Sequence, residues 1–217
     1  MKYGESIFDI LYLLFAVTAG VIIFVKGRTR AEKMMGLASL LLGAGDAFHL
    51  IPRVLDYFVE FDLTAALGVG KLITSITMTL FYVLLYYIWL DVFGRKEKRN
   101  TSVAVWGFAA ARILLCVFPQ NGWTTNDGSL LWAVLRNIPF VILGGILLVL
   151  WFYERAAYKR FRFFWIYILL SFAFYVPVTV GASFIPLLGM LMLPKTVCYI
   201  LMIVTFLLAV TKDRVRK

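Results

Sequence analysis

The sequence predicts an all-α integral membrane protein in which residues 1–217 form one transmembrane domain, a bundle of seven helices. Two features of the composition indicate this class. Of the 217 residues, 62% are hydrophobic and only 16% are charged, whereas soluble domains carry about 25% charged residues. A third observation is the order of the residues along the chain. The apolar residues form seven long segments with short charged clusters between them.

Each segment approaches the roughly 20 apolar residues that a helix needs to cross a bilayer. In chain order, the expected helices are 7–25, 34–51, 66–89, 103–118, 130–153, 163–185 and 194–210. The fourth is short, and the sixth contains Pro177, which predicts a kink in that helix. The connection before the seventh, 186–193, is itself apolar, so we expect an interfacial or re-entrant turn there.

The connections between these helices alternate in charge, which predicts how the chain is oriented. The first, third and fifth connections and the C-terminus each hold four basic residues, 16 of the 22 in the chain. The opposite connections hold acidic residues instead, namely Asp56, Glu60, Asp62 and Asp127. Basic loops face the cytoplasm, so we expect an N-out/C-in protein that is integral to the cytoplasmic (inner) membrane.

The same distribution excludes several classes of protein. The net charge of +10 does not form one patch, so nucleic acid is not an expected partner. Cys116 and Cys198 both lie in apolar segments, which excludes a disulfide-rich scaffold and the usual thiolate metal sites. His49 is the only histidine, so a multi-histidine metal site is excluded, and we expect neither a metal nor a cofactor.

Five basic residues remain in or beside the helices, in the half that the charge pattern places outside. They are Arg53, Lys71, Arg112, Arg136 and Lys195. Four lie close to helix ends, where their side chains can reach lipid phosphates. Arg112 lies within its segment and would have to bury its guanidinium. Because charges inside a membrane are expensive, we interpret the set as the lining of an outward-facing cationic pocket.

The densest polar stretch is Gly45–Arg53, GDAFHLIPR. On a helix, Asp46, His49 and Arg53 share one face, because they are three and four residues apart. A carboxylate beside an imidazole is a plausible acid/base pair or proton relay. The alternative is a structural role in which Asp46 neutralises a buried cation.

Further polar side chains are expected at the same level of the membrane and complete the predicted ligand-binding set. They are Ser75 on the third helix, Gln120 and Asn121 in the connection FPQNGW, Asn137 on the fifth helix and Tyr175 on the sixth.

Several strings resemble a bacterial family of small seven-helix membrane proteins whose function is uncharacterised. They are GDAFHLIPR, GVGKLITSITMTLFYVLLYY, FPQNGW, LRNIPF, SFAFYVPV and MLPKT. This resemblance covers most of the chain and implies a bacterial membrane protein. Residues 36–46, GLASLLLGAGD, resemble the glycine–aspartate helix of the lysoplasmalogenase family of membrane lipid hydrolases, which implies a lipid hydrolase.

Three functions follow as hypotheses. The first is binding or transport of an anionic small molecule or lipid headgroup, because five cations face only Asp46 in the expected pocket. The second is an intramembrane, hydrolase-like lipid-modifying enzyme that uses Asp46 and His49. The third is a sensor or accessory subunit in which the polar cluster only holds the helices together. The sequence leaves open whether the chain has a protein partner or forms a homo-oligomer.

Overall fold

A computed structural model of the chain describes residues 2–125, 128–181 and 184–212, and the regular secondary structure among them is helical, with no strand. Seven of the helices are long and apolar enough to cross a membrane, which confirms the predicted helix count and the all-α class. They are α1 (Lys2–Lys26), α2 (Arg30–Asp56), α3 (Thr64–Val92), α4 (Arg99–Val117), α5 (Leu130–Tyr153), α6 (Phe164–Gly181) and α7 (Met192–Thr211). Three short 3-10 helices, η1 (Pro119–Asn121), η2 (Lys159–Phe161) and η3 (Pro186–Leu191), lie in the connections.

The helix boundaries agree with the predicted spans most closely where the sequence carries a clear signal. Helix α5 has the predicted limits. Helix α2 begins four residues earlier than expected because Thr29 and Glu32 form a capping box, each side chain accepting the other's backbone N–H. Helix α3 begins after Asp62, which accepts the Thr64 N–H at 3.0 Å. Hydrogen bonding to the Thr64 side chain and, to a smaller extent, to this backbone N–H lowers the pKa of Asp62.

The largest departure from the predicted spans lies between the sixth and seventh helices. Helix α6 ends at Gly181, and residues 184 and 185 are not helical, so the predicted end at 185 is wrong; residues 182–183 lie outside the described ranges. The apolar connection forms the 3-10 helix η3. Helix α7 then begins at Met192, before Pro194, because a proline is tolerated in a first turn whose N–H groups lack helical partners.

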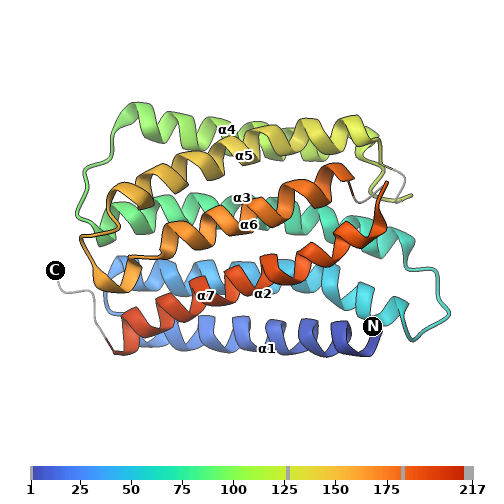
Figure 1. The fold of residues 1–217 in the computed structure, drawn as a ribbon, viewed down its shortest axis with the longest axis horizontal. Helices are drawn as coiled ribbons and strands as arrows, with labels where there is room; N and C mark the ends of the chain where they lie inside the picture. The colour runs from blue at the N-terminus through green and yellow to red at the C-terminus, as the bar shows by residue number, and fades with distance from the viewer. Residues whose placement is uncertain (1, 126–127, 182–183, 213–217) are drawn as a thin grey trace.

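The seven helices lie side by side and alternate in direction (Figure 1). Each helix packs against the next along the chain, and α7 packs against α1, so the bundle closes into a ring. Helix α3 also contacts α5, and α2 also contacts α7. We call the end that holds the connections 27–29, 93–98 and 154–163 the basic end, and the opposite end, where the N-terminus lies (Figure 1), the N-terminal end.

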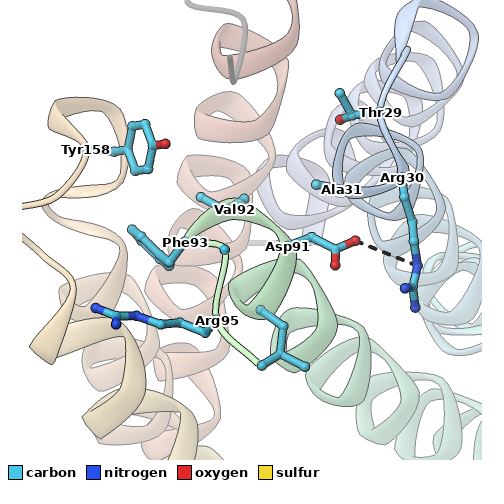
Figure 2. A pocket seen from close by; sticks show the side chains of 10 residues that line it. Thr29, Arg30, Ala31, Asp91, Val92, Phe93, Arg95 and Tyr158 are labelled. Carbon is cyan, nitrogen blue, oxygen red and sulfur yellow. Dashed lines mark ion pairs between the residues drawn. The ribbon is translucent and has the colours of Figure 1, made fainter. Parts of the chain in front are cut away.

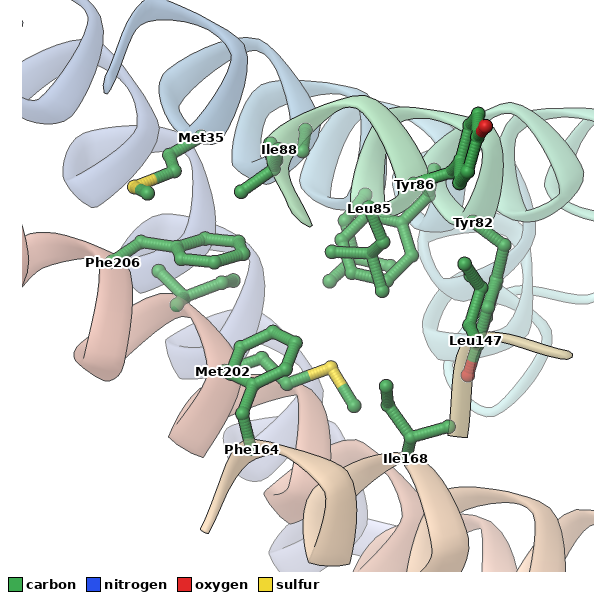
Figure 3. Close-up of a cluster of buried hydrophobic side chains, with 14 of the residues drawn as sticks. Met35, Tyr82, Leu85, Tyr86, Ile88, Leu147, Phe164, Ile168, Met202 and Phe206 are labelled. Carbon is green, nitrogen blue, oxygen red and sulfur yellow. The ribbon is translucent and has the colours of Figure 1, made fainter. Parts of the chain in front are cut away.

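The apolar core fills the middle of the bundle and the half nearer the basic end. Helix α3 contributes a continuous buried face that meets side chains from α2, α5, α6 and α7 (Figure 3). Fully buried members of the core include Met35, Tyr82, Leu85, Tyr86, Ile88, Leu147, Phe164, Ile168, Met202 and Phe206. The polar and charged side chains considered below therefore occupy the half that this core leaves unfilled.

The structure describes only some of the loops in which the sequence predicts alternating basic and acidic charge. The clusters that begin at Lys26, Arg95 and Arg155 lie at one end of the bundle, and the connection with Asp56 and Asp62 lies at the other. Asp127 and the last three basic residues of the chain lie outside the described ranges.

Candidate functional site

A small polar cavity lies between α1, α2, α3 and α7 in the half nearer the N-terminal end. Its volume is about 60 Å³, which is room for about two water molecules at roughly 30 Å³ each. Seven ionisable side chains from three helices line it, namely Glu5, Asp9, Asp46, His49, Arg53, Lys195 and Tyr199. Polar groups around a space of this size favour bound water over an empty void.

Asp46 is held in this cavity by a tyrosine of the first helix. The buried Tyr12 hydroxyl donates a hydrogen bond of 2.7 Å to Asp46 Oδ2. The predicted acid/base partner, His49, lines the same cavity but makes no hydrogen bond with Asp46, and its Nδ1 has no partner among the described residues. The structure therefore brings the two side chains to one cavity without joining them directly.

Arg53 is neutralised rather than free. It forms an ion pair with Glu5 of α1, and the Tyr57 hydroxyl donates a 3.0 Å hydrogen bond to the other oxygen of the same carboxylate. These contacts tie the beginning of α1 to the end of α2 at the mouth of the cavity, where 30% of the Arg53 side chain and 19% of the Glu5 side chain remain exposed.

A second group of cations lies deeper, among aromatic rings. The Arg112 side chain, on α4, is only 2% exposed, and its guanidinium carbon lies 3.3 Å from the centre of the Phe140 ring. Its Nε and Nη1 atoms have no hydrogen-bond partner in the described part of the chain. A buried guanidinium that leaves donors unused is uncommon, because each unused donor costs about 1–3 kcal/mol.

Arg136 contacts the connection between α4 and α5. Its Nη1 donates to Asn121 Oδ1 at 2.5 Å, and its guanidinium lies 4.5 Å from the centre of the Trp123 ring. The Asn121 amide in turn donates to the carbonyl oxygens of Leu115 and Phe118. The predicted site residues Arg136 and Asn121 are therefore direct partners.

Lys195 lies between the two groups. It is 7% exposed, and its Nζ lies 4.3 Å from the centre of the Tyr175 ring and 5.5 Å from that of Tyr199. Its charge is close enough to interact with Asp46 on one side and with Arg112 on the other. Any change of charge on one side is therefore felt by the other through this side chain.

The predicted residues Asn137 and Tyr175 form a hydrogen-bonded pair between α5 and α6. The Tyr175 hydroxyl donates to Asn137 Oδ1 at 2.7 Å, and the Asn137 amide donates to the Ala133 carbonyl at 2.7 Å. Both line an apolar groove of about 230 Å³ between α5 and α6, so this pair separates the buried cations from the outer surface of the bundle.

Other predicted residues lie outside these contacts. Ser75 donates to the Lys71 carbonyl of its own helix, which is a local backbone contact of the kind that serine makes in membrane helices. Lys71 is half-buried on α3, within electrostatic range of Arg136 and Arg53. Gln120 is exposed.

The five cations do not line one cavity, and the charge balance assumed from the sequence is wrong. Asp46 is not the only acid, because Glu5 and Asp9 of α1 reach the same cavity. The signal for them is present in the sequence, since Glu5, Asp9 and Tyr12 recur at helical spacing and so share one face. Glu5 precedes the expected first span, 7–25, whereas Asp9 and Tyr12 lie inside it, so the stripe crosses the expected helix boundary.

The deeper cations nevertheless form no direct ion pair with an acid in the described part of the chain, although Lys195 has the charge of Asp46 within range. The ion pairs among the described residues join Arg30 to Asp91, Arg53 to Glu5 and Arg95 to Glu154. None of them includes Arg112, Arg136 or Lys195, so these three charges are stabilised by rings, amides and hydroxyls. In a low-dielectric interior, such a group attracts an anion strongly.

A larger hollow of about 520 Å³ lies at the basic end, between the α1–α2 connection and the end of α3 (Figure 2). The Arg30–Asp91 ion pair, at 3.6 Å, and the side chains of Phe93 and Tyr158 line it. Its charges are paired, and no residue of the predicted site takes part in it.

The part of the chain that the structure describes contains no group of three or more His, Cys, Asp or Glu side chains placed to hold a metal ion. Comparison of the chain with protein-family models, with curated proteins and with solved structures finds no match.

Proposed function

We propose that this chain is a multi-pass membrane protein that binds or transports an anionic small molecule or lipid headgroup. The binding site consists of Arg112, Arg136 and Lys195. The observation that carries the proposal is Arg112, whose buried guanidinium has, among the described residues, two N–H-bearing nitrogens without partners and no ion pair with a carboxylate. An isolated buried charge is costly, and an arriving anion would remove that cost.

The three cations have complementary tasks in this proposal. Arg112 offers the planar, forked donors that suit a carboxylate or phosphate. Lys195 adds a point charge on a flexible stem, and Arg136, near the beginning of α5, is held in place by Asn121 of η1. The Asn137–Tyr175 pair stands between this group and the outer surface, where it would have to part for a ligand to enter from the lipid.

The alternation of basic loops supports an N-out/C-in orientation, which would place this site in the outer half of a cytoplasmic membrane, as the resemblance to a bacterial family also suggests. The lipid-hydrolase alternative has weaker support, because Asp46 is bonded to Tyr12 and not to His49. In a sensor or accessory subunit whose polar cluster only holds the helices together, we would expect every buried charge to be paired. The unused donors of Arg112 do not favour that alternative.

The test is thermal unfolding of the purified protein in detergent with sulfate, inorganic phosphate, glycerol phosphate or phosphatidylglycerol. We expect at least one of these anions to raise the midpoint, and Arg112→Met to abolish the rise. Without an anion, Arg112→Met should be at least as stable as the wild type, because it removes an uncompensated buried charge. Stabilisation by phosphatidylglycerol alone would identify a lipid, and stabilisation by phosphate or glycerol phosphate a soluble ligand.

Arg99→Met is the matched control, since Arg99 lies on the same helix, is exposed and is at the basic end. It should leave the anion effect unchanged. An anion effect that persists in Arg112→Met, or no effect of any of the four anions on the wild type, would refute the proposal.

A further inference from the structure

The acidic side of the small cavity has a group that the anion site does not use. Asp9 of α1 is 4% exposed, and its Oδ2 has no hydrogen-bond partner among the residues in the described ranges. It lines the cavity of about 60 Å³ together with Asp46 and Glu5. A buried carboxylate oxygen that faces a water-sized space without a donor needs either a proton or a bound donor.

The charges around Asp9 can be balanced one by one. Glu5 and Arg53 neutralise each other in an ion pair, and Asp46 has the charge of Lys195 in range and the Tyr12 hydroxyl as its donor. Asp9 is then the acid left without a cation of its own. One proton on this group would make the cavity electrically neutral.

The groups that face Asp9 come from every helix around the cavity. They are Glu5 and Tyr12 of α1, Asp46, His49 and Arg53 of α2, and Lys195 and Tyr199 of α7, while α3 contributes the uncharged Thr74 and Met78. The cavity also has a route to water, because its mouth is formed by the partly exposed Glu5–Arg53 pair. A proton can therefore reach Asp9 from the N-terminal end without crossing the apolar core.

From these contacts we propose that Asp9 is a proton-binding site and that proton binding there is linked to anion binding through Lys195. The linkage rests on the proposed function, whereas the proton site itself does not. When an anion arrives beside Arg112, it takes up the positive charge of Lys195 that Asp46 had shared. The acids of the cavity then lose compensation, and one proton from water enters as the anion binds.

The sign of the effect follows from reciprocity. If the anion increases proton binding at Asp9, protons must increase anion binding by the same factor. Anion affinity is therefore expected to rise as the pH falls, and one proton should be taken up for each anion bound. In a transporter, this arrangement would move the anion and a proton in the same direction.

The proton site is tested first, without any anion. Infrared spectra of the full chain in lipid nanodiscs, recorded from acidic to alkaline pH, should show the carbonyl band of a protonated carboxylic acid that titrates. Asp9→Asn should remove this band, and Asp91→Asn should not, since Asp91 is paired with Arg30 at the basic end. If Asp9→Asn does not fold, Asp9→Glu should keep the band and shift its frequency.

A band that survives Asp9→Asn, or that disappears instead in Asp46→Asn, would overturn the assignment of the proton to Asp9. The linkage is tested with sulfate and with phosphatidylglycerol, neither of which changes its protonation near neutral pH. Thermal stabilisation by the effective anion should increase as the pH falls in the wild type and become independent of pH in Asp9→Asn.

Equal pH dependence in the wild type and in Asp9→Asn would overturn the linkage even if the infrared result stands. Failure of both anions to stabilise the protein at any pH would count against the proposed function and remove the linkage with it. The infrared band would then decide, independently, whether Asp9 binds a proton.

Discussion

The hydrogen bond from Tyr12 to Asp46 is a contact between α1 and α2 that fixes the position of a half-buried acid. Tyr12 is 2% exposed, so the hydroxyl and the carboxylate oxygen have few other partners. Tyr12→Phe keeps the ring and removes only the donor. Because a half-buried, charged acceptor loses its donor, we expect a loss of about 1–3 kcal/mol of unfolding free energy, measured by thermal or denaturant unfolding in detergent.

Tyr153→Phe is the control for this change. Tyr153 is 74% exposed and makes no hydrogen bond through its hydroxyl within the described residues. Removal of this hydroxyl should therefore leave the unfolding free energy unchanged. Equal stability of Tyr12→Phe and the wild type would mean that the bond contributes nothing measurable in the folded protein.

At the scale of single residues, the sequence identifies which side chains are unusual but not which ones meet. Arg112 stands out because it is a cation inside an apolar segment, and it is indeed buried. The partner of Asp46 is different, since helical spacing within one segment points to His49 and the actual donor, Tyr12, is 34 residues away. Such contacts depend on how two helices are rotated, which the pattern of one helix does not determine.

At the scale of the helices, close packing of α1 on α2 depends on Gly36. A Cβ atom built there would lie 2.6 Å from the Cα atom of Phe24, which is backbone and cannot move aside. Gly36→Ala should therefore separate the two helices and destabilise the protein by about 1–3 kcal/mol. It should also distort the polar cavity, because Asp9 and Asp46, which line it, come from these same two helices.

Gly107→Ala on α4 is the matched control, since nothing lies within 4 Å of a Cβ atom there. Alanine favours a helix over glycine by about 0.5–1 kcal/mol, so this variant should be slightly more stable than the wild type. Unfolding curves of the two variants side by side check the prediction, and a Gly36→Ala protein as stable as Gly107→Ala would contradict it.

The helices themselves could be predicted well because the bilayer imposes their length and composition. The limits of α5 match the prediction, since its apolar run stops at charged or polar residues on both sides. Between α6 and α7 the prediction failed, because the connection is as apolar as the helices and carries no charge that marks a boundary. There the 3-10 helix η3 and the early start of α7 depend on backbone geometry around the prolines.

At the scale of the whole molecule, the ring of helices brings α1 and α7 together and so places the first and last helices side by side in the bundle. The cavity exists only because of this closure, since Asp9 comes from α1 and Lys195 from α7. No local pattern in the sequence predicts that these two side chains lie around one space, although each separately appears as a charge inside an apolar segment.

The orientation of the bundle is the last prediction. The positive-inside rule places the loop with Lys96 in the cytoplasm and the loop with Glu60 outside. Both positions are exposed, and the only native cysteines, Cys116 and Cys198, are buried and can be replaced by alanine. In that background, a membrane-impermeant maleimide should label Glu60→Cys on intact cells and Lys96→Cys only after the membrane is permeabilised. The reverse pattern would invert the topology and place the proposed anion site and the mouth at Glu5 on the cytoplasmic side, where a proton entering with the anion would come from the cell interior.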